Sequence, residues 1–154
     1  AIFIGINPSV TKEKFYPKGA FDVNILPVTF ETPVIQNLDA RLILLMNYGF
    51  RSTASALIST GAELCLPYYI HRGGFDDGIP KGFYVGPGFA YTRNIYYGNS
   101  SFTAFAEPGY SFVWDDGFSL IIGLQYGQTY FKFDDGTRGQ TTHFGVKVIL
   151  GWWL

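Results

Sequence analysis

The sequence predicts an all-β fold: a closed antiparallel eight-stranded up-and-down transmembrane β-barrel, formed as a single domain by residues 1–154. Composition is one reason, because 19% of the residues are aromatic and only 15% are charged, against about 25% charged in soluble proteins. Nineteen glycines accompany abundant Phe and Tyr, a mix that favours strands and turns over helices. Apolar residues also alternate with small or polar ones over long segments, which is typical of strands that cross a membrane.

Gly, Pro, Asn and Asp divide the chain into eight strand-like segments. Most have at least the length of about 9–11 residues that a tilted strand needs to cross a bilayer. They are expected near residues 2–10, 21–32, 39–50, 56–69, 82–93, 101–114, 118–132 and 142–154. The first starts directly after Ala1, from which we infer a mature chain whose leader has been removed. In the second, Leu26 and Pro27 break the alternation and predict a bulge or an exposed kink.

The last three segments alternate most clearly, because neighbouring side chains of a strand point to opposite faces. In 101–114 one face carries Phe102, Ala104, Ala106, Pro108, Tyr110, Phe112 and Trp114. In 118–132 one face carries Leu120, Ile122, Leu124 and Tyr126. In 142–154 one face carries Phe144, Val146, Val148, Leu150, Trp152 and Leu154. Each segment is therefore predicted to be a strand with one apolar face.

The direction of that apolar face separates two classes of barrel. A soluble ligand-binding barrel turns it inward, whereas a membrane barrel turns it toward lipid. Here the charged residues fall almost wholly in turns and at strand ends. Glu63, Glu107 and Lys147 lie near strand centres, each opposite the bulky apolar residues. We therefore expect the apolar face outside, with a soluble lipocalin-like binder as the alternative.

Turn lengths predict the orientation. The WDDGF turn between the sixth and seventh segments is short, as periplasmic turns usually are, so both termini are expected in the periplasm. The extracellular loops are then near 11–20, 51–55, 94–100 and 133–141, and the connections near 33–38 and 70–81 are periplasmic. Aromatic residues near strand ends either form interfacial girdles or reflect simple β-propensity. They are Tyr68, Tyr69, Tyr91, Tyr110, Trp114, Tyr130 and Trp152.

Several stretches together resemble a family of small eight-stranded bacterial outer-membrane β-barrels of OmpA- and OmpX-like architecture. They are INP near the start, LPVTFETPVIQNLDARLILLMNYGF, GAELCLPYYI, IPKGFYVGPGFAY and AEPGYSFVWDDGFSLIIGLQYG. The resemblance implies a closed barrel in the bacterial outer membrane and implies no reaction. The chain departs from the usual barrel ending, since it finishes in GWWL instead of a terminal Phe.

A polar cluster is expected in the barrel interior, because a charge in a narrow bore must be paired or hydrated. Its members are Glu63, Glu107, Lys147, Gln125 and Asn47. A structural ion-pair cluster is the leading interpretation; a switchable gate in a narrow conduit and an acid–base pair of carboxylates are the alternatives. A separate pair, Glu31 and Arg41, is expected at the periplasmic mouth.

Other residues of types that can take part in catalysis or ligand binding are expected to have structural roles. His143, beside Thr141 and Thr142, has no nucleophilic Ser two residues away, although sequence distance does not exclude a site. His71 is expected in a solvated turn, and Cys65 is expected to point inward as a small packing residue. Three Asp-Asp-Gly triplets predict hairpin turns, with calcium ligation as the alternative. The GPGF stretch lacks the features of a phosphate loop, and its small residues are expected to relieve crowding inside the barrel.

These observations predict a non-enzymatic barrel with no catalytic residue, no cofactor and no metal. We expect a structural or interaction protein whose loops or turns contact lipopolysaccharide or a partner protein of the cell envelope. The alternatives are a narrow conduit or a binder of a small hydrophobic ligand, then a lipid-modifying outer-membrane enzyme. A net charge of −1 gives no electrostatic reason to expect nucleic acid.

Overall fold

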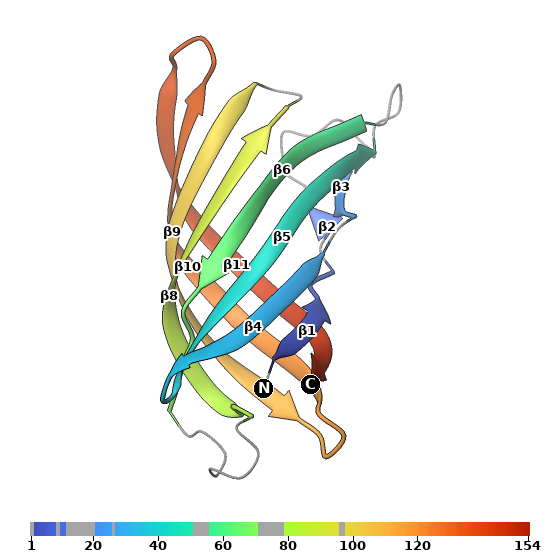
Figure 1. Ribbon diagram of the computed structural model, residues 1–154. Coiled ribbons are helices and arrows are strands. Elements are labelled where there is room, and N and C mark those ends of the chain that lie inside the picture. Colours follow the sequence, from blue (N-terminus) through green and yellow to red (C-terminus); the bar gives the residue numbers. More distant parts are fainter. Residues whose placement is uncertain are drawn as a thin grey trace.

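The computed structural model describes residues 2–8, 10–11, 21–25, 27–50, 56–70, 79–95 and 98–154. Strands make up the regular structure of these residues (Figure 1). The strands are β1 (Phe3–Ile6), β2 (Val10–Thr11), β3 (Phe21–Asn24), β4 (Val28–Ile35), β5 (Leu38–Phe50), β6 (Ala56–Cys65), β7 (Tyr68–Tyr69), β8 (Gly82–Asn94), β9 (Asn99–Val113), β10 (Phe118–Phe133) and β11 (Arg138–Trp153). The described residues include no helix with the length and apolarity needed to cross a membrane.

The strands pair antiparallel in one sheet that returns on itself. Pairing runs in the order β5–β4–β1–β11–β10–β9–β8–β6, and β6 pairs with β5 again, so the hydrogen bonds form a ring. The two ends of the chain close this ring: Phe3 lies opposite Trp153, and Ile2 and Leu154 exchange backbone hydrogen bonds of 3.1 and 2.7 Å. The N and C termini therefore lie side by side at one end (Figure 1).

Prolines account for most differences from the expected segments. An interruption is confirmed near Pro27, because β3 ends at Asn24 and β4 begins at Val28; Leu26 lies outside the described residues. The expected strand 2–10 is wrong as one unit: β1 stops at Ile6, ahead of Pro8 in the sequence, since proline has no N–H for the ladder. Pro67 likewise separates β6 from β7.

The last strand also starts earlier than expected. It begins at Arg138 instead of residue 142, because the preceding turn is tight. In that turn Asp135 Oδ1 accepts the Thr137 N–H at 2.8 Å, and Gly136 has φ +92°. The expected loop 133–141 is therefore mostly strand.

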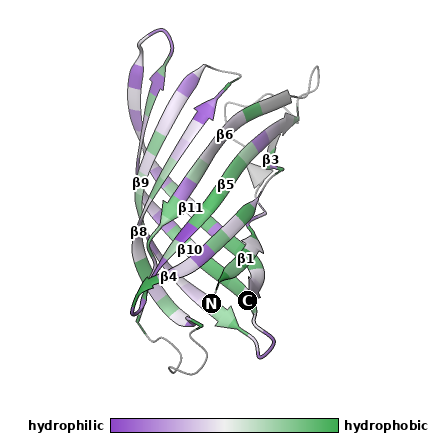
Figure 2. Cartoon of the chain, viewed as in Figure 1, coloured by the Kyte–Doolittle hydropathy of each residue, from purple (hydrophilic) through white to green (hydrophobic). Residues whose placement is uncertain are grey.

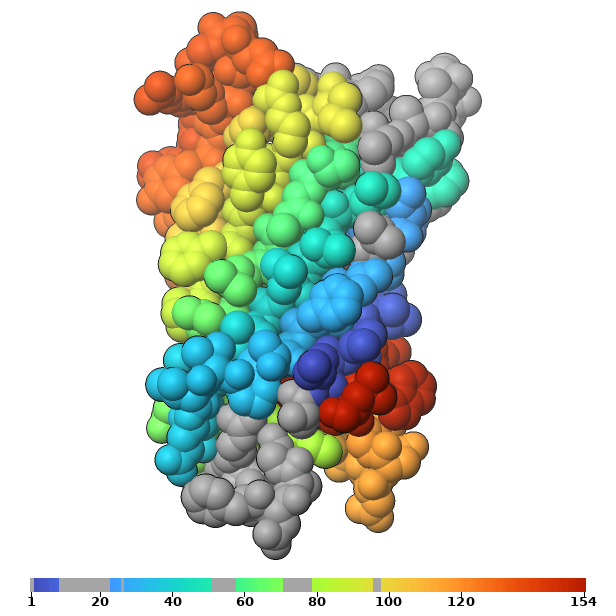
Figure 3. Space-filling view, in the orientation of Figure 1, coloured from blue at the N-terminus to red at the C-terminus, as the bar shows by residue number. Residues whose placement is uncertain are grey.

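The two faces of the sheet differ as the alternation predicts. On β11, Val146 is 65% exposed and its neighbour Lys147 is 5% exposed. Many large apolar side chains are exposed on the outside, among them Phe144, Val146 and Trp152. In the space-filling view of Figure 3, segments distant in the sequence lie side by side across the wall. Hydrophilic residues gather at the β10–β11 hairpin, remote from the termini (Figure 2). The apolar core inside the ring is small and consists of Phe3, Ile43, Tyr69, Tyr84, Ile121, Ile149 and Trp153.

Glycines make room for the larger side chains inside the ring. A Cβ on Gly88 would lie 2.2 Å from the Phe105 ring, and one on Gly109 would lie 2.3 Å from Cζ of Tyr84. Both distances are far below van der Waals contact, so these positions leave space for the aromatic rings. The expectation that small residues of GPGF relieve interior crowding is confirmed.

Candidate functional site

Five charged side chains meet inside the ring of strands. Each lies on an inward position of a different strand, where alternation buries it. They are Glu31 on β4, Arg41 on β5, Glu63 on β6, Glu107 on β9 and Lys147 on β11, and their exposure ranges from 0% to 8%. We call these residues, together with Tyr69, Tyr84 and Gln125, the interior charge network.

Arg41 organises one half of the network. Its Nε donates to Glu31 Oε2 at 2.7 Å, and one terminal nitrogen donates to Glu107 Oε2 at 2.9 Å. The hydroxyl groups of Tyr69 and Tyr84 accept from the guanidinium at 3.2 and 3.3 Å. Each hydroxyl in turn donates to a carboxylate, Tyr69 to Glu31 at 2.5 Å and Tyr84 to Glu107 at 2.7 Å. The fork of Arg41 is thus satisfied on several sides, as a buried guanidinium requires.

Lys147 organises the other half. Its ammonium donates to Glu107 Oε1 at 2.8 Å and also donates to Glu63. The Gln125 amide donates to Glu63 at 3.1 Å and to Glu107 at 2.9 Å. Lys147 also lies 5.6 Å from the ring centroid of Phe105, within cation–π range.

Glu107 joins the two halves. Its Oε2 accepts from Arg41 and Tyr84, and its Oε1 accepts from Lys147 and Gln125. Hydrogen bonds therefore run without interruption from β4 and β5 on one side to β6, β9, β10 and β11 on the others. Side chains of the network bridge the interior of the ring at this level.

His143 extends the network toward the β10–β11 hairpin. Its Nε2 lies 2.9 Å from Oε1 of Gln125, and its ring centroid is 6.0 Å from that of Phe105. The imidazole is half-buried and faces inward. Its hydrogen-bond partner is thus an amide of the network, and the geometry does not pair it with a nucleophile.

The structure brings together four of the five residues predicted for the interior cluster. Glu63, Glu107, Lys147 and Gln125 share hydrogen bonds. The prediction for Asn47 is wrong, because its amide donates to Ser59 at 2.9 Å at another level of the interior. Lys147 and Gln125 each donate to both Glu63 and Glu107, so they bridge the two carboxylates. Each carboxylate is held in an ion pair with Lys147.

The pair of Glu31 and Arg41 forms, but its expected place needs correction. Both side chains are fully buried, and Arg41 connects directly to Glu107. The pair belongs to the interior charge network and is not a separate feature of the mouth. Arg41 lies directly opposite Glu31 across the β4–β5 ladder. Its side chain is long enough to bind Glu31 and also to extend past Glu31 to Glu107.

Sequence reasoning missed the two tyrosines of the network. Tyr84 alternates with the outward Phe83 and Val85, which was a usable signal for its inward direction. Tyr69 was a candidate for an interfacial girdle, but its side chain is buried in the network. It follows the interruption at Pro67, so strand phase did not predict its direction. Cys65 is buried as expected, with its sulfur 3.9 Å from a Glu107 oxygen.

The turn motifs are confirmed where the structure describes them. Asp116 Oδ1 accepts the Phe118 N–H at 3.0 Å, and Gly117 has φ +86°. The triplet at 134–136 forms the corresponding turn before β11. The triplet at 76–78 and His71 lie outside the described residues. In the described part of the chain, no group of three or more His, Cys, Asp and Glu is placed to hold a metal ion.

No protein-family model matches the chain, and a search of curated proteins gives no match.

Proposed function

We propose that this protein is a non-enzymatic eight-stranded β-barrel of the bacterial outer membrane, occluded by its interior charge network, and that it acts as a structural or interaction protein. The inverted distribution of its side chains carries the proposal. Phe144 and Val146 are 67% and 65% exposed on the outside, whereas Arg41 and Glu107 are 0% exposed inside. Soluble monomers rarely expose so much contiguous apolar surface. If lipid surrounds the outer face, these apolar side chains are not exposed to water, and the free-energy cost of hydrating them is absent.

The height of the apolar band supports a membrane location. At the end of the termini, Trp114, Phe118 and Trp152 contact one another with ring centroids 5.3 and 4.9 Å apart. Tyr130 lies about twelve residues beyond Phe118 on β10. That is about 40 Å of strand, and a tilt of about 35–45° reduces it to a rise of about 29–33 Å. A hydrocarbon core is about 30 Å thick, so the two aromatic levels fit its two interfaces.

The interior charge network indicates where function resides. Eight strands enclose a bore that side chains nearly fill, and here charged residues from several walls bridge it. A wide diffusion channel is therefore not favoured, and the outer wall and the loops remain as the interacting surfaces. We assign the end with the termini to the periplasm and the β10–β11 hairpin to the extracellular side, where lipopolysaccharide is the abundant partner.

A depth-dependent substitution tests this proposal. Val146→Arg places a charge in the middle of the proposed apolar band, and Gln140→Arg places the same charge on the same outer face near the hairpin. In lipid the first change is expected to cost about 2–4 kcal/mol and the second about 0–1 kcal/mol. The measurement is urea unfolding of the full chain in phospholipid vesicles, with heat-modifiable migration on gels as the check of folding. Folding of the unsubstituted chain as a soluble monomer in plain buffer would overturn the proposal.

A narrow conduit is the second candidate, and one observation favours it. Lys147 binds two carboxylates, Glu63 and Glu107, so its ammonium has two acceptors between which it can shift. Ion conductance across planar bilayers that increases in Lys147→Ala would support this function. Conductance that is absent in both proteins would leave the occluded barrel as the better description.

A further inference from the structure

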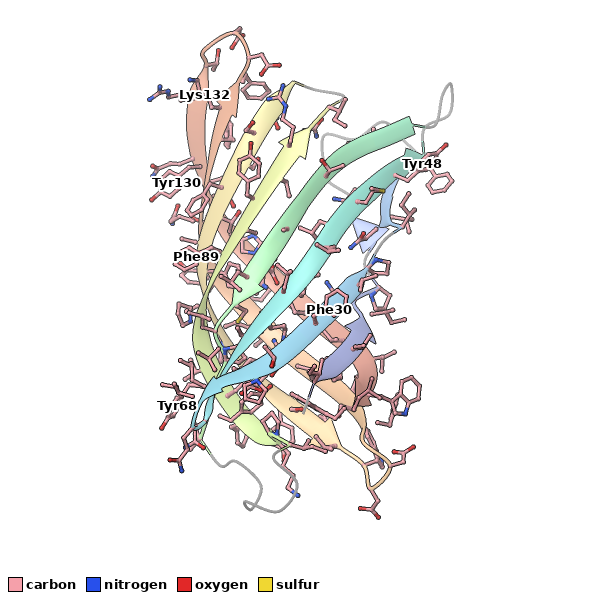
Figure 4. All side chains as sticks on the ribbon, in the orientation of Figure 1. Phe30, Tyr48, Tyr68, Phe89, Tyr130 and Lys132 are labelled. Carbon is pink, nitrogen blue, oxygen red and sulfur yellow. The ribbon has the colours of Figure 1, made fainter. Side chains whose placement is uncertain are left out.

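Two adjoining grooves lie on the outer wall of β8–β11. The first has a volume of about 590 Å³ and is lined by Tyr91, Phe102, Tyr130, Lys132, Arg138 and Gln140. The second has a volume of about 660 Å³ and is lined by Val85, Pro87, Phe89, Ala104, Ala106 and Tyr126. The two meet where the rings of Phe89 and Phe102 stack at 6.0 Å. Figure 4 shows Lys132, Tyr130 and Phe89 one below another along this wall. Both volumes fall within the range of small-molecule sites.

Two cations face each other in the first groove. Lys132 lies directly opposite Arg138 in the β10–β11 ladder, and both side chains are exposed. Like charges placed directly opposite destabilise a strand pair. The acidic residues of the hairpin form no ion pair with either cation: Asp134 binds Arg93 at 2.8–2.9 Å, and Asp135 accepts the Thr137 N–H. No ion pair joins either cation to another described residue, so the pair is suited to an added anion.

The second groove is a hollow in an otherwise bulky apolar surface. Small side chains form its floor, with Ala104 and Ala106 on β9 beside Pro87 on β8, and Phe89 and Tyr126 form its sides. Ala104 lies about four residues from Ser100, which is the β9 partner of Lys132. That separation is about 14 Å along the strand. A hollow of this kind, about 14 Å along the wall from a cation pair, matches an acyl chain attached to an anionic headgroup.

We propose that β8–β11 form a binding site for the phosphorylated lipid anchor of lipopolysaccharide. One phosphate lies between Lys132 and Arg138, and one acyl chain lies against Ala104 and Ala106. This inference rests on the proposed function, which places the β10–β11 hairpin at the outer leaflet. Charge complementarity and the adjoining apolar hollow favour a lipid that carries both phosphate and several acyl chains. The amphipathic ring of Tyr130 is suited to the interface between the two parts.

The first test removes the two charges. The full chain is folded in detergent micelles and titrated with bisphosphorylated lipid anchor, and bound lipid is counted by native mass spectrometry. Lys132→Gln combined with Arg138→Gln is expected to weaken binding about thirtyfold, or about 2 kcal/mol. Lys81→Gln is the matched control, because Lys81 is also exposed but precedes β8 at the opposite end. Equal affinity in the double variant and in the unsubstituted chain would overturn the site.

The second test fills the hollow and leaves the charges in place. Ala106→Phe is expected to weaken binding of the same lipid about tenfold, because it occupies the position of the acyl chain. Inorganic phosphate that competes as well as the lipid anchor does would show that the cations alone bind, and would overturn the lipid site. Phosphatidylglycerol that binds as tightly would overturn the choice of lipid.

Folding controls separate the two levels of inference. Each variant is first checked for heat-modifiable migration and for insertion into vesicles. Failure of the unsubstituted chain to insert into vesicles would contradict the proposed function itself. A chain that inserts normally, but binds the lipid anchor equally well with and without Lys132 and Arg138, contradicts this site alone.

Discussion

Removing Lys147 should destabilise the protein strongly, because the interior charge network leaves Glu63 no other described cationic partner. Lys147 is 5% exposed and forms ion pairs with Glu63 and Glu107. Glu107 keeps Arg41 as a partner at 2.9 Å, whereas the remaining hydrogen-bond partner of Glu63 among the described residues is the amide of Gln125. Breaking a buried pair from one side costs about 3–5 kcal/mol, since an uncompensated charge stays buried. We expect Lys147→Met to lower the free energy of unfolding by that amount.

The matching double variant separates charge from packing. In Glu63→Gln combined with Lys147→Met, both partners become neutral and the side chains keep about the same size. Replacing a buried ion pair by neutral groups is often close to neutral in stability. We therefore expect the double variant to recover most of the loss, with a coupling energy of up to about 3 kcal/mol between the two positions.

The assay is urea unfolding in phospholipid vesicles, followed by tryptophan fluorescence at several protein concentrations. The dependence of the unfolding free energy on urea should be unchanged, because the surface exposed on unfolding is the same. A loss below about 1 kcal/mol in Lys147→Met, together with additive effects of the two substitutions, would refute the reasoning that a dry, mutually dependent network fills the interior.

Three further predictions concern packing, titration and ring closure. Gly109→Ala should cost about 1–3 kcal/mol in urea unfolding, because its Cβ would lie 2.3 Å from Cζ of Tyr84; an unchanged midpoint would contradict this packing. Hydrogen bonds from Arg93 hold the pKa of the Asp134 carboxyl below its ordinary value, so their contribution is present above the ordinary pKa of Asp and is lost as the pH falls through the folded-state pKa. Arg93→Gln should raise that pKa in an NMR titration, and an unmoved midpoint would argue against the contact. Phe3→Ala should cost about 3–5 kcal/mol in urea unfolding, because its fully buried ring fills the junction of β1 and β11, and a loss near zero would contradict that closure.

The sequence predicted which face of a strand each side chain occupies better than the level at which that side chain lies inside the ring. Alternation alone gave the outward direction of Val146 and the inward direction of Lys147, because side-chain direction in a strand has a period of two. It worked best on β9–β11, whose segments contain no proline that breaks the phase. Where Pro67 interrupts the chain, the phase is lost, and Tyr69, expected among the aromatic residues of the strand ends, is buried inside.

Which residues join the network depends on the register between strands, and alternation along one strand does not predict that register. Whether two inward side chains meet is set by the register between strands, which places them at the same or at different levels. Ile43 lies opposite Glu63 in the β5–β6 ladder, whereas Asn47 lies opposite Ser59, just before a register shift at Tyr48. Asn47 is thus about four residues, or about 13 Å, from the level of Glu63, and its amide bonds to Ser59 instead.

The central claim is that the apolar outer face contacts lipid, and two adjacent tryptophans test it directly. Trp152 is 51% exposed on the outside and Trp153 is 5% exposed inside. Two single-tryptophan variants, each with the other tryptophans replaced by Phe, are reconstituted into vesicles that contain brominated phospholipid. We predict strong fluorescence quenching of Trp152 and little quenching of Trp153. Equal quenching of both, or quenching of Trp153 alone, would contradict the assignment of the outer face to lipid.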